Sequence, residues 1–563
     1  MSRIEDIAIK RGQFMIDAVK KIHKRHKHKA MKRTYNAWAT QNENKCFVED
    51  AKVKNNILFS IIVPAFNTDP NHLLAMIYSV VNQHYDNWEL IIVNVSDSFK
   101  IKQKISDSVE IDSRIKVINS PNEGIAANTN RGLDIAKGEY VAFLDHDDLL
   151  HPCALHSMAY DIAVNEATLL YSDEDKITSD GSSYFQPLCK PGWSPDLLRN
   201  VNYINHLSVI KSEFIKRVGG LRQEYNGAQD YDLLLRIIDE CKPKILHVPR
   251  VLYHWRAAAT STARNFDVKG YVLKAGISAI QEHLDRNKIN GTVKSINNRP
   301  GFYCIDYQMP KSISIVIGPV ALNNRSLCAS WVNELVSLTP KNIIIDWVIG
   351  DWYQPFMSES LKDTVKLITS DSGNYWQTAA QLIKGDAVIC FQSCSLPSSN
   401  QYFGDMSAAA MQLDSIVAPV IIDNFKAILY SSLIESSYGL QPLFYGFKFG
   451  ADSYYGSTEW NRNVSAISGQ TFALSRQRFI QLAKYITDSV ITTEMLVKFH
   501  EVQSCLFVSY AHTPFTYKGP LIDAPLSNIN YFNPQLTKAQ NGMSMTESDW
   551  GIIMEASERE IDQ

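Results

Sequence analysis

Short apolar runs alternate with amphipathic stretches between residues 59 and 144, and this alternation restricts the fold more than any other feature. The apolar runs predict strands at residues 59–63, 89–95, 114–118 and 140–144. Helical spacing follows Pro70, which suits the first turn of a helix, and recurs from Ile125 to Ala136, with Gly138 as a candidate C-terminal cap. Alternating strands and helices predict an α/β fold with a mixed, mostly parallel sheet covered by helices on both faces.

The second half of the chain resembles a degenerate copy of the first. Residues 137–152 read KGEYVAFLDHDDLLHP, and residues 384–397 read KGDAVICFQSCSLP, each after similar strand-like and helix-like segments. Aligning the two glycines of these segments pairs Asp145 with Gln392 and Asp147 with Cys394, so the copy lacks the carboxylates. We therefore predict an internal duplication. The predicted parts are a basic helical extension (1–55), a first domain (56–305), a degenerate second domain (306–525) and a tail (526–563).

Composition and the missing motifs exclude several kinds of protein. A net charge of −3 argues against nucleic-acid binding, and the chain has no G-x-G-x-x-G, Walker-type or H-E-x-x-H motif. The nine cysteines are scattered and form no zinc pattern, so we interpret them as reduced, mostly buried thiols. Since neither a secretory signal nor a long apolar run is present, we expect a cytoplasmic protein.

The first 33 residues are strongly basic, with eleven Lys and Arg against three acidic residues. Ile7, Phe14, Ala18 and Ile22 fall near one face of a helix. This pattern indicates a peripheral helix on anionic lipid, at the inner face of the cytoplasmic membrane. A solvated helix or arm is the alternative reading.

Two carboxylates follow the fourth predicted strand. Asp145 and Asp147 stand at the carboxyl end of that strand, where open α/β sheets bind ligands. Crowded acids without an adjacent Lys or Arg predict a cation, and carboxylates suit Mg²⁺ or Mn²⁺. A D-x-D pair is common, and Asp148 could simply cap a helix.

Seven motifs in one order carry a family resemblance. They are VPAFN (63–67), NEGIAANTNRG (122–132), GEYVAFLDHDD (138–148), YSDEDK (171–176), KPGWSPDLL (190–198), GAQDYDLLLR (227–236) and PRVLYHWR (249–256). From about Phe59 to Ala263 the chain resembles glycosyltransferase family 2, whose members are inverting enzymes of the GT-A fold. It is especially similar to the bacterial branch that builds O-antigen, capsule and other surface polysaccharides.

The resemblance implies a role for each matching residue. Asp145 and Asp147 match the D-x-D that contacts ribose and metal, His254 matches a further metal ligand, and Asp230 matches the catalytic base. Matches on the donor side are Pro64, Ala65, Asn67, Gly124, Asn130, Arg131 and His146. Matches in the acceptor or sugar pocket are Asp173, Glu174, Asp175, Trp193, Gln229 and Arg256.

Each match has a structural alternative, and one stretch departs from the family. His254 and Trp193 could be core residues, and Asp230 could cap the helix that follows it. Relatives usually carry an acidic pair where this chain has Asn94 and Asp97. These two residues could still contact the nucleobase, but its identity stays open, with a UDP- or dTDP-sugar favoured.

Three functional hypotheses follow. The first is a metal-dependent, hexosyltransferase-type enzyme that adds one sugar from a nucleotide donor to a lipid-linked glycan. The second is a polymerase that repeats the addition while the second domain holds the chain. The third is a non-catalytic protein that binds glycan or partners. Self-association through the second domain is a further hypothesis.

Overall fold

The computed structural model describes most of the chain between residues 34 and 517. The described ranges are 34–46, 53, 56–107, 110–257, 269–296, 301–319, 325–369, 374–430, 432–436, 439–442, 444, 447–450, 458–486 and 490–517. The predicted basic helix at 1–33 and the tail from 526 lie outside the described residues. Within the described part, no helix has both the length and the apolar character that crossing a membrane requires.

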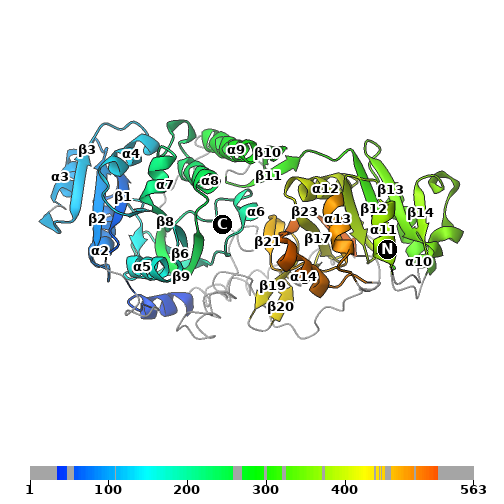
Figure 1. The fold of residues 1–563 in the computed structure, drawn as a ribbon. Coiled ribbons are helices and arrows are strands. Elements are labelled where there is room, and N and C mark those ends of the chain that lie inside the picture. Colours follow the sequence, from blue (N-terminus) through cyan, green and yellow to red (C-terminus); the bar gives the residue numbers. More distant parts are fainter. Residues whose placement is uncertain are drawn as a thin grey trace, which may run out of the picture.

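The first half forms one nine-stranded sheet (Figure 1). The strand order is β3-β2-β1-β4-β8-β6-β9-β5, with β7 beside β6. The first four strands pair in parallel, whereas β8 runs antiparallel to both β4 and β6. The bounds are β1 (Phe59–Ala65), β2 (Trp88–Asn94), β3 (Ile115–Asn119), β4 (Tyr140–Phe143), β5 (Leu149–Leu150), β6 (Leu169–Thr178), β7 (Tyr184–Leu188), β8 (Ser208–Lys211) and β9 (Ile245–Ala257).

Helices cover both faces of this sheet, because its central strands are apolar on both sides. Along β1, Ile62 joins one core cluster, and Ile61 and Val63 join the other. Residues of α4, α7, α8 and α9 belong to the first cluster, and residues of α2, α3 and α5 belong to the second. The bounds are α2 (Pro70–Val81), α3 (Phe99–Asp107), α4 (Ile125–Ile135), α5 (Ala154–Asn165), α6 (Pro195–Leu198), α7 (Ser212–Arg217), α8 (Gln229–Cys241) and α9 (Lys269–Arg286). The predicted strands and helices of this half are therefore confirmed.

Local signals at the helix ends gave one correct and one wrong prediction. Pro70 begins α2, and Asp69 caps it by accepting a hydrogen bond of 2.7 Å from the backbone N–H of Asn71. Gly138 is not a helix cap, since α4 ends at Ile135. A Cβ on Gly138 would lie 2.5 Å from the backbone nitrogen of Ser60, so the glycine is needed for close approach to β1.

The second half repeats the eight-strand path of the first sheet and adds β18 and β21 beside it, for ten strands in all. Its order is β14-β13-β12-β15-β22-β17-β23-β16, which matches the order of the first sheet position by position. The strands are β12 (Ser312–Ile317), β13 (Ile344–Gly350), β14 (Val365–Ile368), β15 (Ala387–Phe391), β16 (Ser395–Pro397), β17 (Ile416–Ile422), β18 (Ile428–Tyr430), β21 (Arg462–Val464), β22 (Thr471–Ser475) and β23 (Phe507–Tyr517), with the hairpin β19 (Leu433–Ser436) and β20 (Gly439–Pro442) beside them. The helices are α10 (Arg325–Ser337), α11 (Tyr375–Leu382), α12 (Tyr402–Gln412), α13 (Arg476–Ala483) and α14 (Thr493–Gln503). The predicted duplication is confirmed.

The two copies also share a polar network that joins their first three strands. In each copy, a serine of the first strand donates a hydrogen bond to a carboxylate of the second strand, which also pairs with a lysine of the third. These residues are Ser60, Glu89 and Lys116 in one copy and Ser314, Asp346 and Lys366 in the other. In each copy the serine oxygen accepts a hydrogen bond of 2.8 Å from the N–H of a glycine, Gly138 or Gly385.

The two halves pack directly against each other. Asn463 on β21 donates to the Asp196 carboxylate at 2.6 Å and accepts from the Asp196 N–H at 3.0 Å. Phe302 stacks on Trp460, with 5.6 Å between the ring centroids. The hairpin of β10 (Gly291–Ser295) and β11 (Tyr303–Tyr307) leads from one half to the other. The boundary that we placed between residues 305 and 306 falls within β11, and the link to β12 follows at 308–311.

The helix at residues 34–42, drawn in dark blue in Figure 1, packs on the first domain and brings a cysteine with it. Cys46 and Cys153 form a disulfide across 107 residues of sequence. The prediction that all nine cysteines are reduced is therefore wrong for this pair, because the fold brings together residues that are distant in sequence. The other seven are free thiols, buried or partly buried.

Candidate active site

The register between β4 and β8 places a histidine opposite the first aspartate of the D-x-D. Antiparallel pairing of Ala142 with Val209 sets Asp145, just after β4, across from His206, just before β8. The His206 Nε2 lies 3.6 Å from Asp145 Oδ2. The His206 ring also stacks on Tyr253, with 4.6 Å between the centroids. His206 was not among the residues that the family match identified.

Asp230 lies in the first turn of α8 and shares this site. Its carboxylate accepts a hydrogen bond of 3.0 Å from Asn202 Nδ2. Burial raises the pKa of the Asp230 carboxyl, the nearby Asp145 raises it further, and His206 lowers it. The structure therefore brings Asp145 and Asp230 together, as the family match implied, and adds His206 and Asn202. An acid whose pKa burial raises and a nearby histidine partly lowers suits a proton acceptor.

The loop that carries the D-x-D is held by its backbone and by Asp148. Asp148 is buried and accepts hydrogen bonds from Tyr253 Oη at 2.6 Å and from the Arg256 N–H at 2.7 Å. Burial raises the pKa of Asp148 well above its usual range, and Asp145 and Asp147 add to the rise. Arg256 also donates to the backbone oxygen of Asp147 at 2.6 Å. Asp148 is thus a loop-fixing residue and not a helix cap.

The side chains of Asp145 and Asp147 remain open. They are 47% and 31% exposed, and no Lys or Arg of the described residues forms an ion pair with either carboxylate. Two exposed carboxylates on a fixed loop, each near a histidine, offer the oxygen donors that Mg²⁺ and Mn²⁺ prefer. This donor pair fits the predicted cation.

His254 does not join the two aspartates. Neighbouring residues of a strand point to opposite faces of the sheet. Tyr253 contacts Asp148 on one face, so His254 points to the other, where its Nδ1 lies 2.6 Å from the Asp175 carboxylate. The ligand atoms of Asp145, Asp147 and His254 do not form a group within 4.8 Å of one another. The contact that the resemblance implied for His254 is therefore not made in this structure, although its buried Nε2 has no hydrogen-bond partner.

His254 instead lies in a pocket that the helix at 34–42 closes. Asp175 holds His254 through one oxygen and accepts a hydrogen bond of 2.7 Å from Tyr35 Oη through the other. Trp38, His151 and Tyr184 also line this pocket. Burial raises the pKa of Asp175, while His254 and Tyr35 lower it.

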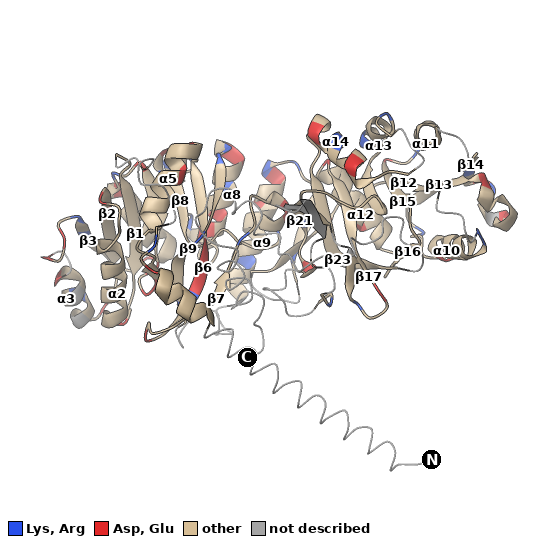
Figure 2. Ribbon diagram, turned by 90° about the horizontal axis from the view of Figure 1, so that it is seen from below, with Lys and Arg blue, Asp and Glu red and all other residues tan. Residues whose placement is uncertain are grey.

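The acidic run on β6, seen in red in Figure 2, is buried and paired. The Asp173 carboxylate accepts from the Lys190 N–H at 2.7 Å, and its oxygen lies 2.8 Å from His247 Nε2. Glu174 forms a buried ion pair with the Lys190 ammonium at 3.0 Å. Asp173, Glu174 and Asp175 therefore hold neighbouring segments together and do not form an open acceptor surface. Pairing explains why a buried run of three acids is tolerated.

The donor candidates on β1 and β2 lie at the carboxyl edge as expected. Pro64 and Ala65 end β1, and the Asn67 N–H donates to Ser96 Oγ at 3.0 Å. The Asn94 amide nitrogen donates to Asn119 Oδ1 at 2.7 Å.

Asp97 follows β2 in the same edge and is exposed. The Asp97 carboxylate is therefore more accessible than the buried Asn94 side chain, the other candidate for contact with the nucleobase.

The start of α4 is joined to the loop before α8. Gly124 caps α4 with a φ of 96°, and a Cβ there would lie 2.7 Å from Asn226 Nδ2. The Asn226 side chain accepts from the Ala126 N–H at 3.1 Å. Both ends of the Asn130 amide are occupied by the backbone of Leu221, so Asn130 fixes this junction and is not a free donor contact.

The remaining candidates surround these loops. Arg131 pairs with Glu123 at 2.5 Å, and Gln229 Oε1 accepts from the Gly227 N–H at 2.7 Å. His146 Nδ1 lies 3.7 Å from Asp147 Oδ1. Trp193, just before α6, is 36% exposed and is therefore not a core residue.

In the described part of the second domain, the positions that correspond to Asp145 and Asp147 carry no carboxylate. Register places Gln392 where Asp145 stands, and the Gln392 amide pairs with the backbone of Ile491 at 2.8 and 2.9 Å. Cys394 is buried, and burial raises the pKa of its thiol to about 12. Glu494, in the first turn of α14, is exposed. Two neutral buried groups at these positions offer nothing to a diphosphate-bound cation.

Comparisons with known proteins identify the family of this chain. The family model "Glycosyl transferase family 2" matches residues 60–216. The O-antigen biosynthesis protein RfbC of Myxococcus xanthus is 36% identical over 44% of this chain and 19% of its own length. The colanic acid biosynthesis glycosyl transferase WcaA of Escherichia coli, named as putative, is 30% identical over 38% of this chain and 79% of its own length.

The first relatives are much longer than the part they share with this chain. The chain spans only 34%, 19% and 29% of the lengths of the first three. Among solved structures, TarS of S. aureus aligns over 41% of this chain and 43% of its own, at 18% identity and a TM-score of 0.30.

Proposed function

The chain belongs to glycosyltransferase family 2, and we propose that its first domain transfers a sugar from a nucleoside-diphosphate donor to a hydroxyl of a bacterial surface glycan, with inversion. The observation that carries this proposal is the cluster of Asp145, His206 and Asp230 at the carboxyl edge of the sheet. Relatives named for O-antigen and colanic acid synthesis support the glycan class.

In the proposed reaction, Asp230 removes the proton of the acceptor hydroxyl. The oxygen then forms a bond to the anomeric carbon as the bond to the nucleoside diphosphate breaks, and the configuration inverts. Mn²⁺ or Mg²⁺, held by Asp145 and Asp147, would neutralise the departing diphosphate. Asn202 keeps the Asp230 carboxylate in place, and His206 lowers the cost of its charge.

The finer parts of this proposal rest on the sequence match. A UDP- or dTDP-sugar is the favoured donor, and a lipid-linked glycan is the favoured acceptor. The basic segment at 1–33, outside the described residues, is proposed to contact an anionic membrane surface. The second domain is proposed to do no chemistry, which the buried Gln392 and Cys394 support.

Asp230→Asn tests the base. We expect transfer to fall by at least about 100-fold while nucleotide binding is unchanged, since general-base catalysis contributes roughly that much. The matched control is Glu494→Gln, which changes the carboxylate at the corresponding helix start of the second domain and should leave transfer intact. Full turnover by Asp230→Asn would refute the assignment.

A nucleotide panel tests the donor and the metal. Thermal stabilisation is measured with UDP, dTDP and GDP, each with and without Mn²⁺. At 100 times its dissociation constant, a ligand should add about 2.7 kcal/mol to the free energy of unfolding. A stabilisation by one nucleotide that needs metal and is lost in Asp145→Ala/Asp147→Ala supports the proposal. Absence of any stabilisation would favour the non-catalytic alternative.

A further inference from the structure

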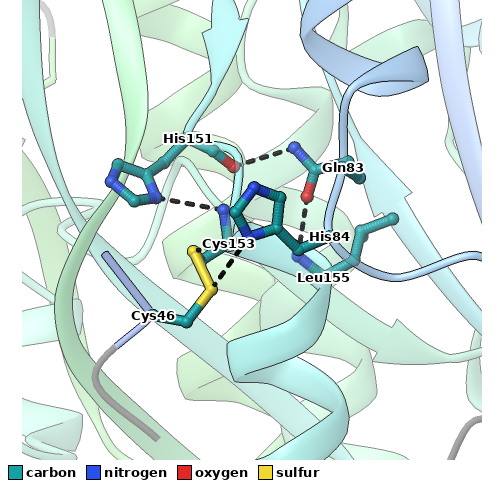
Figure 3. The surroundings of a disulfide bond; sticks show 6 residues. All are labelled: Cys46, Gln83, His84, His151, Cys153 and Leu155. Carbon is teal, nitrogen blue, oxygen red and sulfur yellow. Dashed lines mark hydrogen bonds between the residues drawn. A yellow bond between two sulfur atoms is a disulfide. The ribbon is translucent and has the colours of Figure 1, made fainter. Parts of the chain in front are cut away.

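A second cluster of metal-ligating side chains lies outside the candidate active site. Cys46, His84 and Cys153 have ligand atoms that all lie within 4.8 Å of one another. His84 Nδ1 is 3.4 Å from the Cys46 sulfur and 3.6 Å from the Cys153 sulfur. Figure 3 shows the imidazole beside both sulfurs, which are joined as a disulfide.

A disulfide needs no imidazole, but a thiolate–imidazole metal site does. Zinc binds sulfur at about 2.3 Å and nitrogen at about 2.0–2.1 Å in tetrahedral geometry, which separates a nitrogen ligand from a sulfur ligand by roughly 3.5 Å. Both nitrogen–sulfur distances in this cluster are close to that separation. Only the two sulfurs would have to move apart, to about 3.8 Å.

The residues around the cluster hold two of the three ligands without help from the disulfide. The backbone N–H of His84 donates a hydrogen bond of 2.9 Å to the backbone oxygen of Pro152. Gln83 donates to the His151 oxygen at 2.8 Å and accepts from the Leu155 N–H at 3.0 Å (Figure 3). These bonds tie the end of α2 to the start of α5, so His84 and Cys153 stay together when the S–S bond is broken.

We propose that, when reduced, Cys46, His84 and Cys153 bind a Zn²⁺-type cation, with the fourth position left to water. His84 is exposed, so solvent can reach that position. A dithiol reductant transfers two electrons and two protons to the S–S bond, which breaks to give two thiols and the oxidised reductant. Zn²⁺ then replaces the two thiol protons, which are released.

The site would act as a clip on the helix at residues 34–42. Cys46 follows that helix, whereas the other two ligands belong to the first domain. The same helix supplies Tyr35 to Asp175 and thereby holds His254. The disulfide and the metal-bound form are then two states of the same connection between this helix and the first domain.

Zinc stoichiometry of the reduced full-length chain tests the proposal. Asp145→Ala/Asp147→Ala serves as the background, so that the candidate active site does not contribute metal. After reduction with a phosphine and removal of metal, Zn²⁺ is titrated in competition with a chromophoric chelator. We expect one bound zinc per chain, none with Cys46→Ser/Cys153→Ser, and at least ~10-fold weaker binding with His84→Ala.

Two controls separate a metal site from a disulfide and from misfolding. His84→Ala should still form the Cys46–Cys153 disulfide under oxidising conditions, as measured by mass spectrometry, and Cys241→Ser should bind zinc normally. Co²⁺ added to the reduced chain should give a sulfur-to-cobalt charge-transfer absorption. Equal zinc in the reduced chain with and without the two cysteines, or unchanged affinity in His84→Ala, would overturn the proposal and leave a disulfide only.

Discussion

Tyr35→Phe removes a single oxygen from the junction between the helix at 34–42 and the sheet. The Tyr35 ring is fully buried, and its hydroxyl donates to the Asp175 carboxylate at 2.7 Å. A hydrogen bond to a charged group contributes about 1.5–3 kcal/mol, and phenylalanine keeps the packing of the ring. We therefore expect the opening free energy of this helix to fall by about 1.5–3 kcal/mol.

The assay is native-state hydrogen exchange at the amides of residues 34–42, which reports local opening. Asp175→Ala, which leaves no acceptor for the Tyr35 hydroxyl, provides the second arm of a double-mutant cycle. Each single change removes the same bond. The loss of opening free energy in the double variant should therefore be smaller than the sum of the two single losses, by at least about 1 kcal/mol. Tyr184→Phe is the matched control, since its hydroxyl donates at 2.8 Å to Glu43, which directly follows the same helix.

Two results would refute the reasoning. One is exchange in Tyr35→Phe that equals that of the wild-type chain. The other is additivity of Tyr35→Phe with Asp175→Ala within about 0.5 kcal/mol, as expected only for independent sites such as the Tyr184 control. Either result would mean that the carboxylate does not hold the helix.

Three further predictions concern the site, the sheet and pH. His206→Asn should lower transfer at least ~10-fold and shift the acid limb of the pH–rate profile to higher pH, because His206 lowers the pKa of Asp230; an unshifted limb would contradict this. Gly138→Ala should lower the free energy of unfolding by about 1–3 kcal/mol, since its Cβ would lie 2.5 Å from the β1 backbone. The measurement is a denaturant titration, and the neutral control is Gly192→Ala, which has open space around it. Burial lowers the pKa of His151 to about 3, so the unfolded chain binds a proton at this residue first as pH falls. The free energy of unfolding should therefore decrease below pH about 6.5, by at most about 1.4 kcal/mol per pH unit. His151→Gln should remove this decrease.

Much of the fold could be predicted from local patterns in the sequence. Apolar runs in the first half gave β1 to β4, Pro70 gave the start of α2, and the repeat KGEYVAFLDHDD against KGDAVICFQSCS gave the duplication. Each of these signals lies within a short stretch of chain, where period and turn chemistry are decisive. The repeat also contains Asp145 and Asp147, whereas Asp230 was identified by the family match.

Other contacts depend on which distant segments meet. His206 reaches Asp145 only through the antiparallel register of β4 and β8, and His254 faces away because it follows Tyr253 on β9. No spacing in the sequence states a register or a strand's facing.

The sequence by itself determined the two α/β domains and the loss of acids in the second, since these follow from period and from the internal repeat, and the family match supplied the residues of the candidate site. The tertiary structure alone decided that Asp173, Glu174 and Asp175 are buried supports, that Cys46 meets Cys153 and His84, and that Tyr35 reaches Asp175. The physical reason is that these contacts join segments from about 16 to 140 residues apart, and only the packed sheet brings such segments within bonding distance.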